Sequence, residues 1–513
     1  MRAPTRPILA AFLTILTSLI PAAPAAAQRA TLLDWSPCAL DATVQCATLS
    51  VPIDWSDPYS ARVGISLARR PATDPGARIG ALVVNPGGPG GSGVDFAMDS
   101  DYFFSPELRK RFDIVGFDPR GVGHSNPVRC TATLAGAVPS PFINSPQAYA
   151  ATIDYNRRLA ADCRANTGPV YDYVDTLSVV RDTEALRATL GEPRLNFYGA
   201  SYGSLIGEQY ADRYPDRVRS IVLDSVLDHS VDTDGFLNAE TDAAQDSFEQ
   251  FVAWCARDAS CALHGRDVSA VWAGLLTRAA AGELRDPFDP GSVVTESAFL
   301  GMAFTSFYEP QWFSLAHYLN EANSQPPQAG GTTMPAPSGL IANPFAAIFC
   351  ADWSLPIAGY PEYRALLDRL RARAPQMQAS TLGLTGTADC LGQPAPPRNP
   401  QHDLRPAQSP ILLVNARHDP ATAYSWAQHV ARQLGPKAAL LTYGGWGHVI
   451  YNRTPCVKAV VDKYLIDGSV PAAGAECPAV PPVPFGVGGA VSAGAVAKSA
   501  PTGQRPDPHW GYR

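Results

Sequence analysis

The sequence is poor in charge and has no basic stretch. Asp, Glu, Lys and Arg make up 17% of the 513 residues, and the formal net charge is -7 at pH 7. A general nucleic-acid binder needs clustered cations that neutralise phosphates, so this composition argues against one. A hydrophobic fraction of 46% instead indicates a globular protein with a substantial core.

The sequence also lacks the spacing of metal ligands. Its ten cysteines include no Cys-x-x-Cys pair and no paired Cys/His spacing, and such spacings are typical of zinc sites. We therefore expect no bound metal and no cofactor. We find no internal repeat, and the sequence leaves the oligomeric state open.

No long apolar run follows the N-terminal segment, so we expect no membrane-spanning helix in the mature protein. The N-terminus carries Arg2 and Arg6, an apolar run over 8–20 and small residues at 24–27. This order is typical of an export signal, and the mature chain then begins near Gln28. The alternative is a membrane anchor, but the run is shorter than the roughly 20 apolar residues of a spanning helix. The sequence predicts a secreted protein, extracellular or in the cell envelope.

The cysteines gain a meaning in an exported protein. An oxidising environment favours disulfides, and the even number allows complete pairing. Spacing does not determine the connectivity, so other pairings stay open, and the arrangement that we consider joins each cysteine to its sequence neighbour. These pairs are Cys38 with Cys46, Cys130 with Cys163, Cys255 with Cys261, Cys350 with Cys390, and Cys456 with Cys477.

Predicted strands and helices alternate in the first half of the chain. Short apolar runs at 79–84, 112–117 and 217–224 predict strands, and 179–190 predicts a helix between them. This alternation is typical of an α/β fold whose mostly parallel central sheet is covered on both faces.

The pattern then becomes helical, and strands return only at 411–416 and 438–443. We interpret the helical part as a lid inserted into the core, with a Pro/Gly-rich loop over 325–344. The expected organisation is a signal peptide at 1–27, the first part of the core at 28–224, the helical lid at 225–407, the second part of the core at 408–480 and a disordered tail at 481–513.

The central motif is Gly199-Ala200-Ser201-Tyr202-Gly203, which follows a predicted strand. A serine at a strand-to-helix turn, with glycines two positions away on each side, fits the G-x-S-x-G nucleophile elbow. The turn brings the two flanking positions close together, so they need residues without a side chain. Ser201 is therefore the candidate nucleophile. The alternative is a chance glycine-flanked serine in a loop.

A second glycine-rich stretch, over 85–93, follows the predicted strand at 79–84. Its uncovered backbone N–H groups can supply one donor of an oxyanion hole, and the N–H of Tyr202 can supply the other. Pro86 and Pro89 have no N–H, so Gly87 and Gly88 are the better candidates, and we select Gly88. The alternative is a flexible linker.

An acid and a histidine follow the two late strands. Asp419 comes just after the strand at 411–416, and His448 comes just after the strand at 438–443. Active sites of open α/β sheets form at the carboxyl ends of their strands, and the order Ser, Asp, His is that of this fold. The alternatives are a turn aspartate before Pro420 and a loop histidine. The neighbouring His418 is interpreted as a bystander.

The segment Asp118-Pro119-Arg120-Gly121-Val122-Gly123-His124-Ser125 is dense in turn residues. We interpret it as a structural turn, and a direct catalytic role is the alternative.

These motifs together resemble a known family. The elbow, the glycine loop, the 118–125 segment and the contexts of Asp419 and His448 are similar to the secreted tripeptidyl aminopeptidase branch of the α/β-hydrolase serine peptidases, related to prolyl aminopeptidases. The resemblance covers about 38–477. It implies an α/β-hydrolase fold and cleavage of short peptides from N-termini, with the lid recognising the free amine. The usual Thr-Pro after the acid is here Thr422-Ala423, a departure that concerns substrate choice.

An aminopeptidase must bind an ammonium group, and a sheltered carboxylate is its natural partner. The lid candidates are Glu240, Asp242, Glu321 and Asp352, of which we select Glu240 and Asp352. The alternative is that these acids lie on solvated helix faces.

The leading hypothesis is therefore a secreted serine exopeptidase that acts on peptides through Ser201, Asp419 and His448. The first alternative is an esterase or lipase with the same triad, because both reactions pass through an acyl-enzyme. A catalytically silent binding protein on a hydrolase scaffold is the second alternative.

Overall fold

A computed structural model describes residues 33–328, 338–393 and 396–484. The predicted signal peptide, and the predicted tail from residue 485 onward, lie outside these ranges. Within the described residues, no helix is long and apolar enough to cross a membrane.

The described part of the chain is built on a ten-stranded sheet with the order β1-β2-β3-β5-β4-β7-β8-β10-β11-β12. The pairs from β1 to β5 through β2 and β3 are antiparallel, and every pair from β5 to β12 is parallel. The predicted fold class, an α/β-hydrolase with a mostly parallel sheet, is confirmed. The strands are β1 (Ser36–Pro37), β2 (Gln45–Pro52), β3 (Arg62–Arg70), β4 (Gly80–Asn85), β5 (Phe112–Phe117), β7 (Leu195–Ala200), β8 (Val218–Asp224), β10 (Ile411–His418), β11 (Ala438–Trp446) and β12 (Glu476–Cys477).

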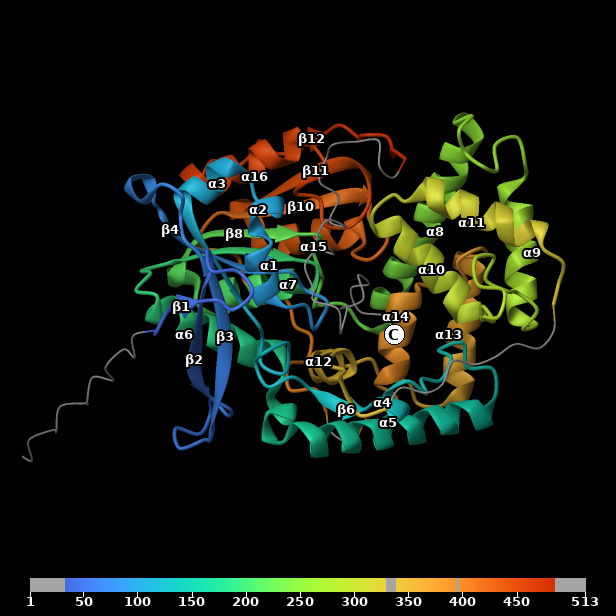
Figure 1. The fold of residues 1–513 in the computed structure, drawn as a ribbon, viewed down its shortest axis with the longest axis horizontal. Helices are drawn as coiled ribbons and strands as arrows, with labels where there is room; N and C mark the ends of the chain where they lie inside the picture. Colours follow the sequence, from blue (N-terminus) through green and yellow to red (C-terminus); the bar gives the residue numbers. More distant parts are fainter. Residues whose placement is uncertain (1–32, 329–337, 394–395, 485–513) are drawn as a thin grey trace, which may run out of the picture. The chain divides into compact units, whose positions relative to one another are not determined.

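Helices cover both faces of this sheet (Figure 1). The central strands are buried along their whole length, as expected of parallel strands between two helical layers. One layer consists of α1 (Gly93–Met98), α3 (Pro106–Arg111) and α16 (Pro455–Asp467), whose apolar side chains join the core residues Leu82, Ile114 and Val222. The other consists of α6 (Thr176–Thr189), α7 (Tyr202–Arg213) and α15 (Tyr424–Leu434), which share a core with Val83 and Phe197.

The region between β8 and β10 is helical, as predicted, and has an aromatic core. Trp272, Trp312 and Trp353 are among its largest fully buried side chains. Most of its helices lie to the right of β10 and β11 in Figure 1, whereas the helix over 345–352 lies below the sheet in that view. The helices of this region are α8 (Thr233–Arg257), α9 (Val268–Ala280), α10 (Glu296–Tyr308), α11 (Trp312–Ser324), α12 (Phe345–Asp352), α13 (Tyr360–Arg373) and α14 (Thr381–Asp389).

One helix from before the elbow also belongs to this lid core. The long helix α5 (Pro146–Thr167) packs Tyr149 and Tyr155 into the same cluster of buried side chains. Its Asn156 donates hydrogen bonds of 2.8 and 3.0 Å to the carbonyls of Ala388 and Leu391, at the end of α14. The lid is therefore anchored to the first part of the chain, which the sequence pattern did not indicate.

The predicted loop over 325–344 is wrong at its end. Residues 340–342 form the strand β9, which pairs antiparallel with β6 (Arg129–Thr131). The residues of β9 are all exposed, so the sequence shows no alternation of apolar and polar residues that would predict a strand.

The five expected disulfides all form. They join Cys38 to Cys46, Cys130 to Cys163, Cys255 to Cys261, Cys350 to Cys390, and Cys456 to Cys477. Two of them tie together neighbouring helices and strands, because Cys130 lies in β6 and Cys163 in α5, and Cys456 lies in α16 and Cys477 in β12.

The 118–125 segment has structural partners. The carboxylate of Asp118 accepts hydrogen bonds from Ser92 Oγ at 2.6 Å, Val94 N at 3.1 Å and His124 N at 2.8 Å. Arg120 is fully buried and forms a two-pronged ion pair with Asp182, at 2.6 and 2.7 Å. These contacts tie the turn after β5 to α1 and α6, in agreement with its interpretation as a structural turn.

We expect Arg120→Met to lower the free energy of unfolding by about 3–5 kcal/mol, because it leaves Asp182 as an unpaired buried charge. Urea unfolding followed by tryptophan fluorescence, with the disulfides kept intact, measures the change. The control is Arg158→Met, which removes the exposed pair with Asp154 and should cost under about 1 kcal/mol. Equal losses in the two variants would contradict the structural role of Arg120.

Candidate active site

Ser201 lies at the turn between β7 and α7, at the carboxyl end of a central strand. Its backbone has φ 55° and ψ -126°, a left-handed conformation that is rare for a residue with a side chain. A hydrogen bond of 2.8 Å from its N–H to the carbonyl of Asp224 holds this conformation. Ser201 is half-buried, and its hydroxyl makes no hydrogen bond with any of the described residues. The hydroxyl is therefore available to attack a substrate.

The flanking glycines make room for this turn, as predicted. A Cβ at position 199 would overlap the backbone carbonyl of Gly203, and a Cβ at position 203 would lie 2.7 Å from the carbonyl oxygen of Asn85. The elbow therefore packs against the end of β4 as well as against itself.

The glycine-rich loop after β4 lies against the elbow. A Cβ at Gly87, whose φ is +90°, would be 2.7 Å from the backbone nitrogen of Tyr202. The Gly87 N–H donates to Asn85 Oδ1 at 2.9 Å, so it is already engaged. Within the described residues, no hydrogen bond uses the N–H of Gly88 or that of Tyr202, the first residue of α7. The two N–H groups selected from the sequence are thus unpaired among the described residues. The N–H of Tyr202 lies at a helix N-terminus, which suits an oxyanion, and the N–H of Gly88 lies in the adjacent loop.

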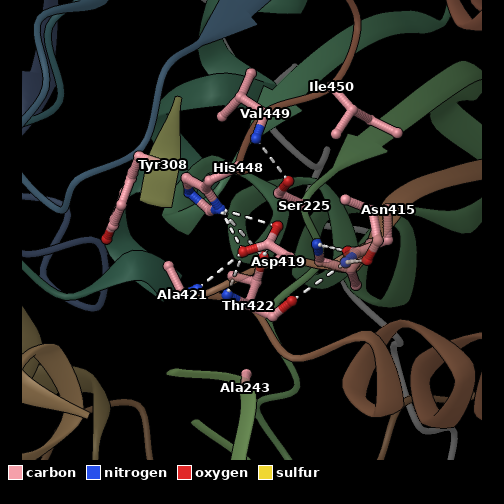
Figure 2. Close-up of polar contacts among 12 residues, drawn as sticks. Ser225, Ala243, Tyr308, Asn415, Asp419, Ala421, Thr422, His448, Val449 and Ile450 are labelled. Atoms are coloured by element: carbon pink, nitrogen blue, oxygen red, sulfur yellow. Dashed lines mark hydrogen bonds and ion pairs between the residues drawn. The ribbon is translucent and has the colours of Figure 1, made fainter. Parts of the chain in front are cut away.

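Asp419 and His448, far apart in the sequence, meet at the ends of β10 and β11 (Figure 2). His448 Nδ1 lies 3.0 and 3.1 Å from the two carboxylate oxygens of Asp419. The carboxylate also accepts hydrogen bonds from Ala421 N, Thr422 N and Thr422 Oγ1, each at 2.9 Å. Both side chains are buried, so water competes little for this pair.

The electrostatics of this pair suit a histidine base. Burial raises the pKa of Asp419, but the charge and hydrogen bond of His448 and the backbone N–H groups of Thr422 and Ala421 outweigh it and leave that pKa below 3.8. Asp419 is therefore ionised across the range in which enzymes work. A carboxylate on Nδ1 holds the proton there, which leaves Nε2 as the nitrogen that can accept a proton from a serine.

Asp224, at the end of β8, joins the serine and histidine loops. Its backbone carbonyl accepts the Ser201 N–H, and its buried carboxylate accepts Ile450 N at 2.8 Å and Tyr451 N at 3.0 Å. The next residue, Ser225, accepts Val449 N through its hydroxyl at 2.8 Å, as Figure 2 shows. The end of β8 thus places the elbow beside the loop that carries His448.

The lid contacts His448 directly. Tyr308, the last residue of α10, packs its ring edge-on against the imidazole with 4.8 Å between centroids, and its carbonyl accepts the His448 N–H at 2.8 Å. The guanidinium of Arg453 donates to both carbonyls, of Tyr308 at 2.7 Å and of His448 at 3.1 Å. The bystander His418 has a lid contact of its own, with Asp246 of α8 at 2.7 Å.

The structure buries Glu240, in α8, close to this pair. Its Oε2 accepts the hydroxyl of Ser380 at 3.0 Å, at the N-terminus of α14. Within the described residues no hydrogen bond reaches Oε1. Burial raises the pKa of Glu240 to about 8, hydrogen bonds from Ser380 and Gly383 oppose the rise, and the charge of Asp419 adds to it.

The other acids considered in the lid have protein partners. Asp352 is fully buried and accepts hydrogen bonds from three residues, Thr176, Tyr202 and Asn399. Asp242 is exposed and pairs with Arg373, and the half-buried Glu321 lies 4.0 Å from His317 on the same helix. The structure does not bring Asp242 or Glu321 to the candidate site.

The sequence reasoning missed three supports of the site: Asp224, Thr422 and Tyr308. Asp224 had a recognisable signal, because it is a charged residue at the end of a buried parallel strand, where active sites of such sheets form. Thr422 lies three residues after Asp419, within reach of its carboxylate. Tyr308 carried no signal, because an aromatic at a helix end is common in any lid.

The family model for the α/β hydrolase fold matches residues 80–452, from β4 to the loop that carries His448. The chain belongs to the α/β hydrolase family. This α/β hydrolase contains, among its described residues, no group of three or more His, Cys, Asp or Glu side chains that could hold a metal ion.

Several relatives of this α/β hydrolase match it over most of their length. Serine protease Hip1 of Mycobacterium tuberculosis is 30% identical over 492 residues, covering 86% of this chain and 90% of the relative. Carboxylesterase B of the same species is 32% identical over 466 residues, covering 85% and 86%. Tripeptidyl aminopeptidase of Streptomyces lividans is 28% identical over 478 residues, covering 87% and 86%. The predicted resemblance to this branch of the family is confirmed.

Proposed function

We propose that this α/β hydrolase is a secreted serine exopeptidase, which removes single residues or short peptides from the N-termini of peptides. The observation that carries the proposal is the buried Asp419–His448 pair beside the strained Ser201 turn, with the buried Glu240 carboxylate nearby in the lid. The relatives named as a serine protease and a tripeptidyl aminopeptidase support the peptide as substrate.

The chemistry follows from the placement of these groups. His448 Nε2 takes the proton of Ser201 while Oγ bonds to the scissile carbonyl carbon, and Gly88 N–H and Tyr202 N–H stabilise the resulting oxyanion. The C–N bond then breaks, and His448 returns the proton to the leaving amine. His448 Nε2 then takes a proton from a water molecule whose oxygen bonds to the acyl carbon. The bond from that carbon to Ser201 Oγ breaks, His448 returns the proton to Oγ, and the acid is released.

Glu240 is the proposed partner of the substrate amine. Its Oε2 is anchored by Ser380 and its Oε1 has no protein donor among the described residues, so one oxygen can accept an ammonium N–H. The N-terminus of α14 favours a negative charge at this position. Asp352 is a weaker candidate, because its hydrogen bonds come from protein groups.

The contact between Glu240 and the substrate amine should depend on pH, because both groups titrate. The Glu240 carboxyl, with its pKa raised to about 8, is mostly protonated at pH 7 and ionises as the pH rises through 8. An α-amino group loses its proton above about pH 8. Binding requires the ionised carboxylate of Glu240 and the protonated amine of the substrate at the same pH. KM for a free-amine substrate should therefore be lowest near pH 8, rise at lower pH as Glu240 takes up a proton, and rise at higher pH as the amine loses its proton.

Glu240→Gln tests the proposal. With aminoacyl and peptidyl anilides, this variant should raise KM by about 10-fold or more. It should also abolish the rise of KM below pH 8, because an amide cannot ionise. The same substrates with an acetylated N-terminus are the matched control, and wild type should cleave them far more slowly than the free amines. The variant Asp242→Asn, which alters an exposed acid of the same helix, should leave KM unchanged. Equal cleavage of free and acetylated substrates by wild type would refute an exopeptidase.

An esterase is the second candidate, and the relative named Carboxylesterase B favours it. The same nucleophile, base and oxyanion donors serve an ester, since only the leaving group differs. A panel of acyl esters beside the anilides separates the two functions. Efficient turnover of esters with no cleavage of any anilide would favour the esterase.

Secretion is supported by two features. The N-terminal 27 residues have the order of an export signal, and five disulfides are typical of a protein that folds in an oxidising compartment.

A further inference from the structure

Asp352 ends the lid helix α12, and its carboxylate is enclosed by donors from three other parts of the chain. Oδ1 accepts Thr176 N at 2.7 Å and Asn399 Nδ2 at 3.0 Å, and Oδ2 accepts Thr176 Oγ1 at 2.6 Å and Tyr202 OH at 2.7 Å. An ionised carboxylate offers about four lone-pair positions. Every one of them is used by the protein, and the side chain is fully buried.

Burial raises the pKa of Asp352 to about 7, and the hydrogen bonds from Thr176 and Asn399 oppose this rise. Thr176 is the first residue of α6. Its N–H therefore has no carbonyl partner within the helix and lies at the positive end of the helix dipole. The Thr176 and Tyr202 hydroxyls and the Asn399 amide can all donate to it. Such a group has no lone pair left for an ammonium ion from a substrate. Asp352 must therefore act on the enzyme rather than on the substrate.

Its partner Tyr202 is the residue after the nucleophile. The backbone N–H of Tyr202 is the proposed oxyanion donor, and its side chain, 5% exposed, ends in the hydroxyl that Asp352 holds. A helix can turn slightly about its axis or fray at its first residue, and either motion moves this N–H. Fixing the far end of a buried Tyr202 side chain restricts both motions.

We infer that Asp352 is a positioning residue, which holds the Tyr202 N–H in the oxyanion hole by anchoring the Tyr202 side chain to α6 and to the lid. The inference rests on the proposed oxyanion role of Tyr202. It also links the lid to catalysis, because α12 belongs to the lid and α7 to the sheet domain. A lid helix thereby sets the geometry of the transition state, in addition to any role in binding the acyl group.

The test compares two substrate classes with Asp352→Asn and Tyr202→Phe. Tyr202→Phe removes the hydroxyl that donates to Asp352, Asp352→Asn replaces one acceptor oxygen of the carboxylate by an NH2 group and so weakens the same contact, and each variant keeps the Tyr202 backbone. We expect kcat to fall about 10- to 100-fold on both an aminoacyl anilide and p-nitrophenyl acetate, with KM changed less than about threefold, because an oxyanion forms in both reactions. The double variant should lose little more than either single variant, since both break one contact. Active-site titration with a fluorophosphonate normalises each kcat to folded enzyme.

Asp389→Asn is the matched control, because Asp389 is a half-buried lid carboxyl at the end of α14 and no hydrogen bond among the described residues joins it to Tyr202. It should retain kcat on both substrates. The inference is overturned if Asp352→Asn impairs only the free-amine substrate, since the group would then bind the amine. It is also overturned if Tyr202→Phe keeps full kcat, or if Asp389→Asn loses as much. A separate result would contradict the peptidase proposal: the wild-type enzyme would hydrolyse p-nitrophenyl acetate but would not cleave the aminoacyl anilide.

Discussion

Ser201→Ala should lower kcat by about 10⁵-fold or more on any substrate that the wild-type enzyme turns over. Alanine has no group that can form the acyl-enzyme, whereas the oxyanion donors and the lid stay in place. The residual rate then reflects binding and the oxyanion hole alone. The position tolerates alanine only with strain, because the backbone at 201 has φ 55°.

The measurement is steady-state kinetics, together with fluorophosphonate labelling followed by peptide mapping. Wild type should carry the label on Ser201, and the variant should carry none. Circular dichroism and the count of intact disulfides confirm that the variant is folded. Activity within about tenfold of wild type, or labelling of another serine, would show that Ser201 is not the nucleophile.

Asp419→Asn should lower kcat by about 10⁴-fold. The amide keeps the shape of the side chain, but its nitrogen can donate to His448 Nδ1 and so stabilises the tautomer with the proton on Nε2. That tautomer cannot accept the Ser201 proton. The variant also fails to stabilise the positive charge that His448 acquires during the reaction.

A matched acid–histidine pair provides the control. Asp246→Asn alters a carboxylate that lies 2.7 Å from His418 and contacts neither Asp419 nor His448. It should change kcat by less than about tenfold. The pKa of Asp419 lies below 3.8, so its ionised form is lost only as the pH falls through that lowered value, and mild acid does not imitate Asp419→Asn. A small effect of Asp419→Asn at pH 8 would contradict the triad.

The candidate site could be predicted from the sequence where its residues are close together in the chain or follow neighbouring strands. The elbow is a local turn, so its glycines and serine stand together in five residues. Asp419 and His448 could be predicted because parallel strands end at one edge of a sheet, and the order of strands then brings their following residues together. The sequence-neighbour disulfides are local in the same sense, because each closes a short or moderate loop.

The choice between Glu240 and Asp352 was not predictable in this way. Both are acids in helices of the same lid, and a helical pattern gives the face of a residue but not the partner packed against it. Folding gave Asp352 the donors of Thr176 and Asn399, from segments far away in the chain, and left one oxygen of Glu240 without a protein donor. The strand β9 was missed for a similar reason, because its partner β6 is distant and neither alternates clearly.

Local chain chemistry alone thus predicts the nucleophile turn, the late acid and histidine and the alternating α/β core, whereas the pairing of the cysteines stayed open until the fold brought them together. The tertiary structure alone decides which lid carboxylate is enclosed by donors and which keeps one oxygen without a donor among the described residues. It also alone decides that Asp224 joins the loops that carry Ser201 and His448 and that the ring of Tyr308 packs against His448. The physical reason is that burial and hydrogen-bond satisfaction depend on neighbours in space, and a lid takes those neighbours from segments more than 100 residues away.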